Sequence, residues 1–257
     1  MFDSLAEKSI WVVGGAGFLG SAITKALDQI EARVVCMDLA GRAETLVRQA
    51  SLQHTRPVSW DVSDGAQIDS MVDRMVTEHG VPDGVAYLAY VSSAGKKLEE
   101  LSRDDVTRTF SLSLPPTFLL SRAIAEKMKP RGSGSIVLFA SMYGVVAPDP
   151  KIYNAPLKPN PVDYGMTKAA LLQMARYFAV HYGPAGIRFN CITPGPFPNP
   201  FLQKNEPDFI QKLAAKTPLG RVGHSDEIVG PTLFLLSESS SFITGHSLVV
   251  DGGWTAW

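Results

Sequence analysis

Tyr164 and Lys168 lie four residues apart in the run Tyr164-Gly165-Met166-Thr167-Lys168, where a segment with helical spacing begins. In a helix this separation puts both side chains on the same face. The pKa of a phenol is ordinarily about 10, too high for proton exchange at neutral pH. An ammonium held beside the phenol favours the phenolate and lowers that pKa. The pair therefore predicts a general acid/base for interconverting an alcohol and a carbonyl.

A glycine-rich turn further upstream predicts a nucleotide site. Gly15, Gly17 and Gly20 form G-x-G-x-x-G directly after the apolar run 9–13, where a helical pattern opens. Glycines there allow a tight turn and let a pyrophosphate approach bare backbone. The N-terminus of the following helix would then face the phosphate charge. We expect this turn to hold the cofactor through Gly14, Gly15, Gly17, Phe18, Leu19 and Gly20.

Asp38 ends the second apolar run, 18 residues after Gly20. A carboxylate at this place accepts hydrogen bonds from the ribose hydroxyls and repels a 2′-phosphate. No arginine or lysine stands in the turn before Gly17, and Leu39 follows Asp38. The sequence thus favours NAD over NADP. Arg42 would reverse this preference if its side chain folded back over the ribose.

Asp61 and Val62 end the third apolar run and have two interpretations. They suit the adenine amino group and the apolar face of its ring. Asp61 equally suits the N-cap of a helix that begins near Ser63 and Asp64. Both interpretations stay open on the sequence alone.

Short β-branched runs alternate with longer helical patterns along the whole chain. This alternation predicts one α/β domain over 1–257 with a doubly wound parallel sheet, whose ligands bind at the carboxyl ends of the strands. The expected strands are 9–13, 33–37, 56–60, 84–89, 135–140, 187–192 and 247–250. The expected helices are 18–31, 42–52, 64–79, 102–129, 163–182 and 225–237.

Composition limits the class of protein. The chain has 257 residues, a formal net charge of −1 and 45% apolar residues, enough for a sizeable core. No basic stripe favours nucleic acid and no basic amphipathic helix favours a membrane surface. Residues 1–8 lack the apolar core of a secretory signal, so we expect a cytoplasmic protein. Cys36 and Cys191 sit in apolar runs and read as buried core thiols; we predict no metal site.

Two proline-rich segments interrupt the alternation of expected strands and helices, at 147–162 and near 194–200. Each follows an expected strand, so each should border the site as a rigid wall. We expect 147–162 and 194–217 to form the substrate loops. Their polar side chains suit a polyhydroxylated small molecule, one that carries a carboxylate or phosphate if the lysines take part; these are Lys151, Tyr153, Asn154, Lys158, Asn160, Asn199 and Gln203. Solvent-exposed loop residues are the alternative reading. His224 reads as a surface residue before a helix.

Five motifs in order resemble the short-chain dehydrogenase/reductase family over essentially the whole chain. They are the glycine turn, Ser141 after an apolar run, Tyr164-x-x-x-Lys168, Asn190 leading to Pro194-Gly195, and the ending Thr244-Gly245 to Asp251-Gly252-Gly253. The resemblance implies a Rossmann-type sheet of seven strands and a nicotinamide cofactor. It also implies a homo-oligomer, a dimer or a tetramer, that packs through the helices at 102–129 and 163–182.

The resemblance assigns roles to single residues. Tyr164 resembles the general acid/base, and Lys168 the residue that lowers its pKa and binds the nicotinamide ribose. Ser141 resembles the hydrogen-bond donor to the substrate oxygen. By the same resemblance, cofactor contacts are expected from Ala89, from Ile192 and Thr193, and from Pro194, Gly195 and Phe197.

Three places depart from the family pattern. Ser113 takes the place of a catalytic asparagine that helps to hold a water, and Pro115-Pro116 should distort that helix. Tyr87-Leu88-Ala89-Tyr90 replaces Asn-Asn-Ala-Gly, so bulky groups replace polar ones and a glycine. Ser141 and Tyr164 are 23 residues apart, a longer interval than is usual in the family.

These features predict an NAD-dependent oxidoreductase for a secondary alcohol and a ketone on a sugar-like substrate. Part of the sequence is similar to members assigned to surface-polysaccharide or flagellin-glycan sugar biosynthesis. Two alternatives stay open. One is a sugar epimerase or dehydratase that retains NAD. The other is an NAD-binding sensor or scaffold whose chemistry was weakened by the departures described above.

Overall fold

The structure is a computed structural model that describes residues 3–93 and 95–257. Residues 1 and 2 belong to the segment 1–8, for which no secretory signal was predicted, and lie outside the described residues. Its centre is one seven-stranded parallel sheet with strand order β3-β2-β1-β4-β5-β6-β7. The predicted Rossmann-type sheet is thereby confirmed. The strands are β1 Ser9–Val13, β2 Arg33–Asp38, β3 Thr55–Ser59, β4 Gly84–Tyr87, β5 Gly134–Phe139, β6 Ile187–Pro194 and β7 Ser247–Val250.

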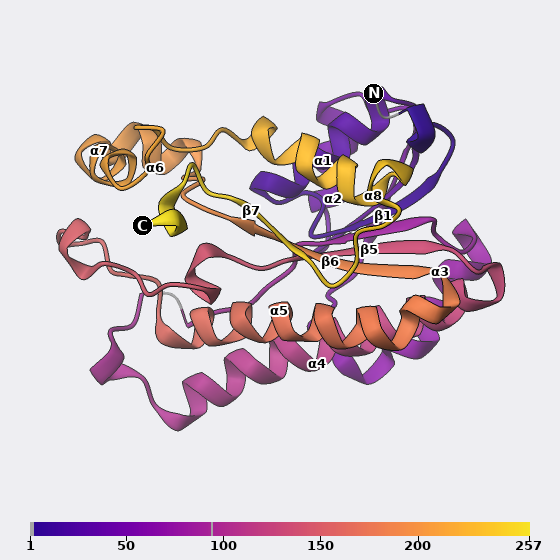
Figure 1. The fold of residues 1–257 in the computed structure, drawn as a ribbon, viewed down its shortest axis with the longest axis horizontal. Helices are drawn as coiled ribbons and strands as arrows, with labels where there is room; N and C mark the ends of the chain where they lie inside the picture. The colour runs from indigo at the N-terminus through magenta and orange to yellow at the C-terminus, as the bar shows by residue number, and fades with distance from the viewer. Residues whose placement is uncertain (1–2, 94) are drawn as a thin grey trace.

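Helices cover both faces of this sheet (Figure 1). α1 and α8 lie on one face, while α3, α4 and α5 lie on the other. The helices are α1 Phe18–Gln29, α2 Arg42–Gln49, α3 Ile68–His79, α4 Arg103–Met128, α5 Val162–Tyr182, α6 Pro200–Asn205, α7 Pro207–Ala215 and α8 Val229–Leu236.

The alternation of side chains along the strands builds a separate core on each face. Trp11 and Val13 of β1 belong to the core with α3, α4 and α5, whereas Ile10 and Val12 belong to the core with α1 and α8. All four side chains are buried, and burying an aliphatic side chain contributes about 1.5–3 kcal/mol. A sheet covered on both sides thus explains why its strands read as continuous apolar runs.

A third core lies beyond the carboxyl ends of the strands. Met142 and Tyr143 follow β5, Ile152 comes from the proline-rich segment, and Leu213 comes from α7. They pack together with Trp254 near the C-terminus of the chain. This cluster fixes the two segments that were expected to border a ligand.

Most predicted elements are found with boundaries shifted by a few residues, and the differences have local causes. Two short helices, α6 and α7, occupy a segment that was read as a loop. Asn199 caps α6, because its side chain accepts a hydrogen bond of 2.9 Å from the Leu202 N–H, and proline opens each helix. Asparagine followed by proline is a helix-start signal that could have predicted α6.

α4 continues through Pro115 and Pro116 as a single helix of 26 residues. Ser102 starts it with a capping box, in which its hydroxyl accepts from the Asp105 N–H and the Asp105 carboxylate accepts from the Ser102 N–H. The two prolines therefore do not end the helix. This continuity places the buried Ser113 against Val91 in the segment that follows β4.

Both cysteines are buried and free, as expected. No helix within the described residues is long and apolar enough to cross a membrane.

Candidate active site

A cavity of about 790 Å³ opens at the carboxyl ends of the strands. The strand order reverses between β1 and β4, and the cavity lies at this point, lined by Val13, Gly14 and Tyr87. This is where doubly wound sheets bind their ligands. Most of the predicted site residues meet here; Gly14, Gly17, Phe18, Leu19, Gly20, Asp38, Asp61, Val62, Ala89, Ser141, Tyr164, Lys168, Pro194, Gly195 and Phe197 all line the cavity.

The glycine turn is shaped by close backbone approach. Gly14 has a positive φ of 80°, and a Cβ built there would lie 2.9 Å from the Ala89 backbone nitrogen. A Cβ on Gly20 would collide with the Gly14 carbonyl oxygen. Larger residues at either place would push the turn away from its neighbours.

The N-terminus of α1 opens toward the cavity. Gly17 is its N-cap and supplies no side-chain hydrogen bond, so the first N–H groups are uncapped by side chains. Phe18 and Leu19, which start the helix, line the cavity. Uncapped N–H groups at the positive end of a helix dipole fit the phosphates of a dinucleotide.

Gly15 differs from its prediction, because it does not line the cavity. A Cβ there would lie 2.8 Å from the Cys36 sulfur, and its carbonyl accepts a hydrogen bond from the Thr24 hydroxyl at 3.0 Å. Gly15 is required for packing between α1 and β2.

Asp38 faces the cavity with both oxygens already hydrogen-bonded to backbone. Oδ2 accepts from the Ala16 N–H and Oδ1 from the Leu39 N–H, each at 2.9 Å. The Arg42 guanidinium folds back to 3.3 Å from Oδ1. The second terminal nitrogen of Arg42, Nη2, donates to the Ala16 carbonyl oxygen at 3.4 Å. The residue that could reverse cofactor preference therefore pairs with the carboxylate that sets it.

Asp61 closes a local turn and does not cap a helix. Its Oδ1 accepts hydrogen bonds from the Ser63 N–H at 3.0 Å and from the Ser63 hydroxyl at 2.7 Å. No helix begins there, since the next helical turn starts at Gly65 and α3 starts at Ile68 with Gln67 as its N-cap, so the N-cap interpretation is wrong. Asp61 is exposed and lines the cavity, as the adenine interpretation requires. Val62 is buried beside it.

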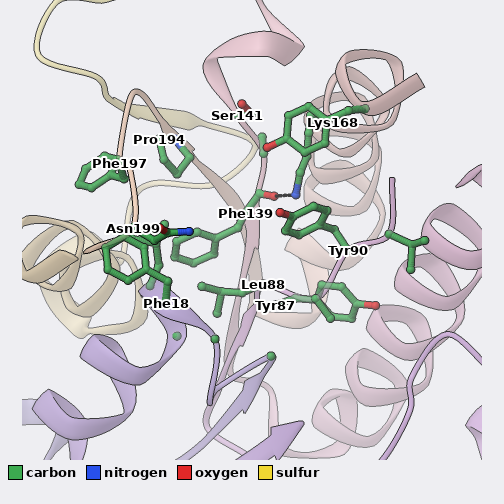
Figure 2. A pocket seen from close by; sticks show the side chains of 18 of the residues that line it. Phe18, Tyr87, Leu88, Tyr90, Phe139, Ser141, Lys168, Pro194, Phe197 and Asn199 are labelled. Carbon is green, nitrogen blue, oxygen red and sulfur yellow. Dashed lines mark hydrogen bonds between the residues drawn. The ribbon is translucent and has the colours of Figure 1, made fainter. Parts of the chain in front are cut away.

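Ser141, Tyr164 and Lys168 converge at the other end of the cavity. Ser141 follows β5, and its hydroxyl accepts a hydrogen bond of 3.2 Å from the Tyr143 N–H. Tyr164 lies in the first turn of α5, and the Ser141 side chain is near enough to lower the pKa of its phenol. Lys168, one turn later, donates to the Phe139 carbonyl at 2.7 Å (Figure 2). The Lys168 Nζ is 5.7 Å from the centre of the Tyr164 ring.

Burial dominates the protonation of both groups. It raises the pKa of Tyr164 to about 12, against the lowering effect of the Ser141 side chain. The expected pKa below that of a free phenol is therefore not found, because burial outweighs the groups that lower it. Burial also lowers the pKa of Lys168 to about 8. Desolvation favours the neutral form of each group, and the sequence carries no direct sign of it.

Ser113 does not join the catalytic cluster. Its hydroxyl accepts from the Val91 N–H at 3.2 Å and donates to the Val91 carbonyl at 3.0 Å. It does not line the cavity, so the structure gives no support for its expected role in holding a water there. Ser113 instead fixes the segment that follows β4. Ile192 and Thr193 also lie outside the cavity lining, and the Thr193 hydroxyl bonds that of Ser247 at 2.6 Å.

The proline-rich segments form the opposite wall of the cavity. Tyr153 contacts Phe209 of α7, with ring centres 5.2 Å apart. Its hydroxyl lies 2.8 Å from that of Tyr143, and the Lys216 ammonium bonds the Asp149 carboxylate at 2.6 Å. The two segments thus hold each other over the site.

This wall carries aromatic and amide groups and no charge. Its lining consists of Met142, Tyr143, Tyr153, Asn160, Phe197, Asn199, Leu202, Phe209 and Leu213. The two lysines proposed as ligand contacts lie elsewhere, because Lys151 is exposed outside the lining and Lys158 donates to the Gly95 carbonyl at 2.6 Å. Asn154 and Gln203 also lie outside the lining, and Gln203 donates to the Pro198 carbonyl. His224 is exposed before α8, as expected.

Tyr90 and Tyr143 are site residues that sequence reasoning did not identify. Tyr143 has no sequence signal beyond its closeness to Ser141. Tyr90 was noticed only as a bulky replacement for a glycine, yet its ring lies against both Lys168 and Tyr164. An aromatic residue where the family has glycine could have been read as a new contact.

Comparison with known proteins agrees with this geometry. A family profile described as "Enoyl-(Acyl carrier protein) reductase" matches residues 15–255. The chain is 32% identical over 258 residues to a D-threitol dehydrogenase of Mycolicibacterium smegmatis, covering 98% of this chain and 94% of the relative. It is 30% identical over 258 residues to the cis-4-hydroxycyclohexanecarboxylate dehydrogenase of Sinomonas cyclohexanicum, covering 100% of both.

A solved structure has the same fold. It is a short chain dehydrogenase from Leptospira borgpetersenii with bound NAD+, which matches with a TM-score of 0.85 and 31% identity over 99% of this chain and 95% of that chain. The similarity covers the glycine turn, the Ser141–Tyr164–Lys168 cluster and the C-terminal strand alike. The chain therefore belongs to the short-chain dehydrogenase/reductase family of oxidoreductases.

Proposed function

We propose that this protein interconverts a secondary alcohol and a ketone on a small, uncharged, hydroxylated substrate, with NAD as the hydride carrier. The observation that carries the proposal is that Ser141, Tyr164 and Lys168 line one dinucleotide-sized cavity, with the Lys168 Nζ 5.7 Å from the centre of the Tyr164 ring. A pure binding protein would have no need of all three groups.

The proposed cofactor would lie among these residues. The uncapped N-terminus of α1 and the glycine turn would hold its phosphates, and Asp38 would bind the adenine ribose. Lys168 and Tyr164 would border its nicotinamide end. The chemistry that a bound nicotinamide supplies is the transfer of a hydride to or from the carbon that bears the oxygen.

The chain's own residues handle the proton. In ketone reduction, Tyr164 donates its phenolic proton to the carbonyl oxygen; with a pKa of about 12 it is protonated at neutral pH. Ser141 donates a hydrogen bond to that oxygen as its charge changes. The Lys168 ammonium stabilises the phenolate that remains. Alcohol oxidation uses the same groups in reverse.

Support for NAD comes from Asp38. Its carboxylate faces the cavity at the end of β2 and would repel a 2′-phosphate. Solved structures of similar fold hold NAD+ in one case and NADP in another, so the choice depends on this chain's own residues. Arg42 is paired with Asp38 at 3.3 Å and is therefore not free to receive a phosphate.

Support for the substrate class comes from the uncharged wall opposite Tyr164. Aromatic rings with two asparagines suit a compact carbon skeleton that carries hydroxyl groups. A carboxylate or phosphate would lose its hydration there without gaining a cation. Of the two named relatives, one is named for threitol, a neutral polyol that fits this class, whereas the other is named for a hydroxycyclohexanecarboxylate, which carries a charge. The narrower links to surface-polysaccharide or flagellin-glycan biosynthesis and to the cytoplasm stay predictions.

A homo-oligomer is part of the proposal. Exposed apolar side chains gather on the long helices α4 and α5, where the family resemblance places the contact between copies. They are Phe118, Val162, Met166, Tyr177 and Val180. Light scattering on the purified protein tests for a dimer or tetramer; a monomer would contradict the proposal.

A substrate screen tests the function. We expect thermal stabilisation by NAD or NADH rather than by the NADP forms, and NADH production with neutral polyols and cyclic diols such as threitol and cyclohexane-1,2-diol. Sugar acids and sugar phosphates serve as charged controls and should react more slowly. Preferred turnover of the charged compounds would overturn the substrate class. NAD retained through purification without net NADH release would point instead to an epimerase or dehydratase, and stabilisation without turnover to a sensor.

A further inference from the structure

Tyr90 makes an unusual pair of contacts for an exposed side chain. It follows β4 and is 58% exposed, yet its ring centre lies 4.8 Å from the Lys168 Nζ. The same ring meets the Tyr164 ring edge-on, with centres 5.6 Å apart and planes inclined at 67°. Figure 2 shows Tyr90 beside the lysine and close to the Phe139 carbonyl that the lysine contacts.

Lys168 has few other groups that stabilise its charge. It is 3% exposed and donates one hydrogen bond, to the Phe139 carbonyl. Within the described part of the chain, Lys168 forms no ion pair with a carboxylate, and the nearby Cys191 thiol of β6 is neutral, because burial raises its pKa to about 12. A buried ammonium without a carboxylate loses its hydration at a large cost. The aromatic faces of Tyr90 and Tyr164 are the remaining groups that attract it.

Neighbouring residues hold Tyr90 in this place. Both backbone polar groups of Val91 bond the Ser113 hydroxyl of α4. Ser93 bonds the Asp163 carboxylate through its N–H at 3.3 Å and its hydroxyl at 2.7 Å. Asp163 is fully buried and belongs to α5, the helix that carries Tyr164 and Lys168. The segment that carries Tyr90 is therefore tied to both helices of the site.

We propose that Tyr90 is a positioning residue that keeps the Lys168 ammonium charged and directed at the catalytic cluster through the face of its ring. The kinetic part of this inference rests on the proposed function. The ring provides the attraction, so the phenolic hydroxyl of Tyr90 is dispensable. The low pKa of Lys168, about 8, makes this support matter near neutral pH.

A direct titration of Lys168 tests the inference without a substrate. The Cε signal of Lys168 in protein carrying ¹³C-labelled lysine is followed against pH and is assigned by its absence in Lys168→Met. Removing a desolvated cation–π contact with Tyr90→Leu should lower the pKa of Lys168 by about half a pH unit or more. Tyr90→Phe and Tyr90→Trp, which keep an aromatic face, should leave it near the wild-type value. An unchanged pKa in Tyr90→Leu, or an equal fall in Tyr90→Phe, would overturn the inference.

A matched control separates this effect from a general response to surface change. Phe242→Leu replaces another exposed aromatic side chain, whose ring is not among the described contacts of Lys168, and should leave the Lys168 titration unchanged. A fall of the pKa there equal to that in Tyr90→Leu would also overturn the inference.

Kinetics supply the second readout once the substrate screen has found a substrate. Tyr90→Leu should move the alkaline limb of the kcat–pH profile to lower pH. The limb of Tyr90→Phe should stay at its wild-type position. A purely structural role would scale the profile without moving the limb, and that result contradicts the inference. Should the screen find no turnover, the proposed function fails while the titration still decides the role of Tyr90.

Discussion

Ser141, which follows β5, and Tyr164, in the first turn of α5, line the same cavity, and the Ser141 side chain lowers the pKa of the phenol while burial raises it to about 12. The same Ser141 oxygen accepts the Tyr143 N–H, which fixes its direction. The two hydroxyls thus form one preorganised site for a substrate oxygen. The structure brings them together across an interval of 23 residues in the sequence.

Replacing Ser141 with alanine should reduce kcat/KM by about 10²- to 10³-fold, the usual loss when one donor to a developing oxyanion is removed. The KM for NAD should stay near its wild-type value, because Ser141 lies at the Tyr164 end of the cavity. Steady-state kinetics with the best neutral polyol measures both constants. Ser141→Thr keeps a hydroxyl and is the matched control, which should retain more activity than the alanine variant. An alanine variant within twofold of wild type would contradict the assigned role.

Lys168 should make the stability of the protein depend on pH. The pKa of this group falls from 10.5 in the unfolded chain to about 8 in the folded protein. Between these values the unfolded chain holds more protons, so stability rises with pH. From pH 7.5 to 9.5 this effect adds about 2 kcal/mol to the free energy of unfolding.

Denaturant unfolding of wild type and Lys168→Met at several pH values measures that contribution. The stability advantage of Lys168→Met should be largest below pH 8 and should shrink as the pH rises. Measurements end at pH 9.5, because the raised pKa of Tyr164 makes stability fall again above about pH 10. If the difference in the free energy of unfolding between the two proteins does not change with pH, the lowered pKa of Lys168 is contradicted.

Asp38 should control the choice of cofactor. Asp38→Asn removes the charge that repels a 2′-phosphate and frees Arg42 from its ion pair at 3.3 Å. The ratio of kcat/KM for NADP to that for NAD should rise about 10-fold or more, which corresponds to about 1.4 kcal/mol. Adding Arg42→Gln should cancel most of this gain. An unchanged ratio in Asp38→Asn would mean that cofactor choice lies elsewhere in the cavity.

Tyr153 should determine substrate binding without affecting the cofactor. Its ring packs on Phe209, and its hydroxyl partners that of Tyr143. Tyr153→Ala removes this wall and should raise the substrate KM about 10-fold or more while leaving the NAD KM unchanged, since about 1.4 kcal/mol of packing corresponds to that factor. The substrate KM of Tyr153→Phe should lie between those of wild type and Tyr153→Ala. Lys151→Ala, an exposed residue of the same segment, is the control; equal effects at both positions would refute a specific wall.

The fold could be predicted because its signals are local. Apolar runs such as 9–13 predicted each strand, and helical spacing over 102–129 predicted α4. Gly14 and Asp38 were found because a Rossmann turn restricts which residues fit at fixed offsets. α6 and α7 were missed because each is short and its packing partners, such as Tyr153, are distant in the sequence.

The parts of the site that escaped prediction depend on tertiary contacts. The direction of the Tyr164 pKa shift follows from burial, which no spacing reveals. The position of Tyr90 over Lys168 joins residues 78 apart in sequence, and it depends on how Ser113 and Asp163 hold the segment between them. Ser113 was assigned by alignment to catalysis, whereas its hydroxyl is occupied by the Val91 backbone.

The turnover of Tyr164→Phe tests the central claim most directly. NADH formation is followed by absorbance at several pH values for wild type and variant, with NAD binding checked by thermal shift in the same samples. Because only the proton-carrying hydroxyl is removed, we predict unchanged NAD binding and a loss of kcat of about 10²-fold or more. Full turnover by Tyr164→Phe would show that another group moves the proton and would contradict the account.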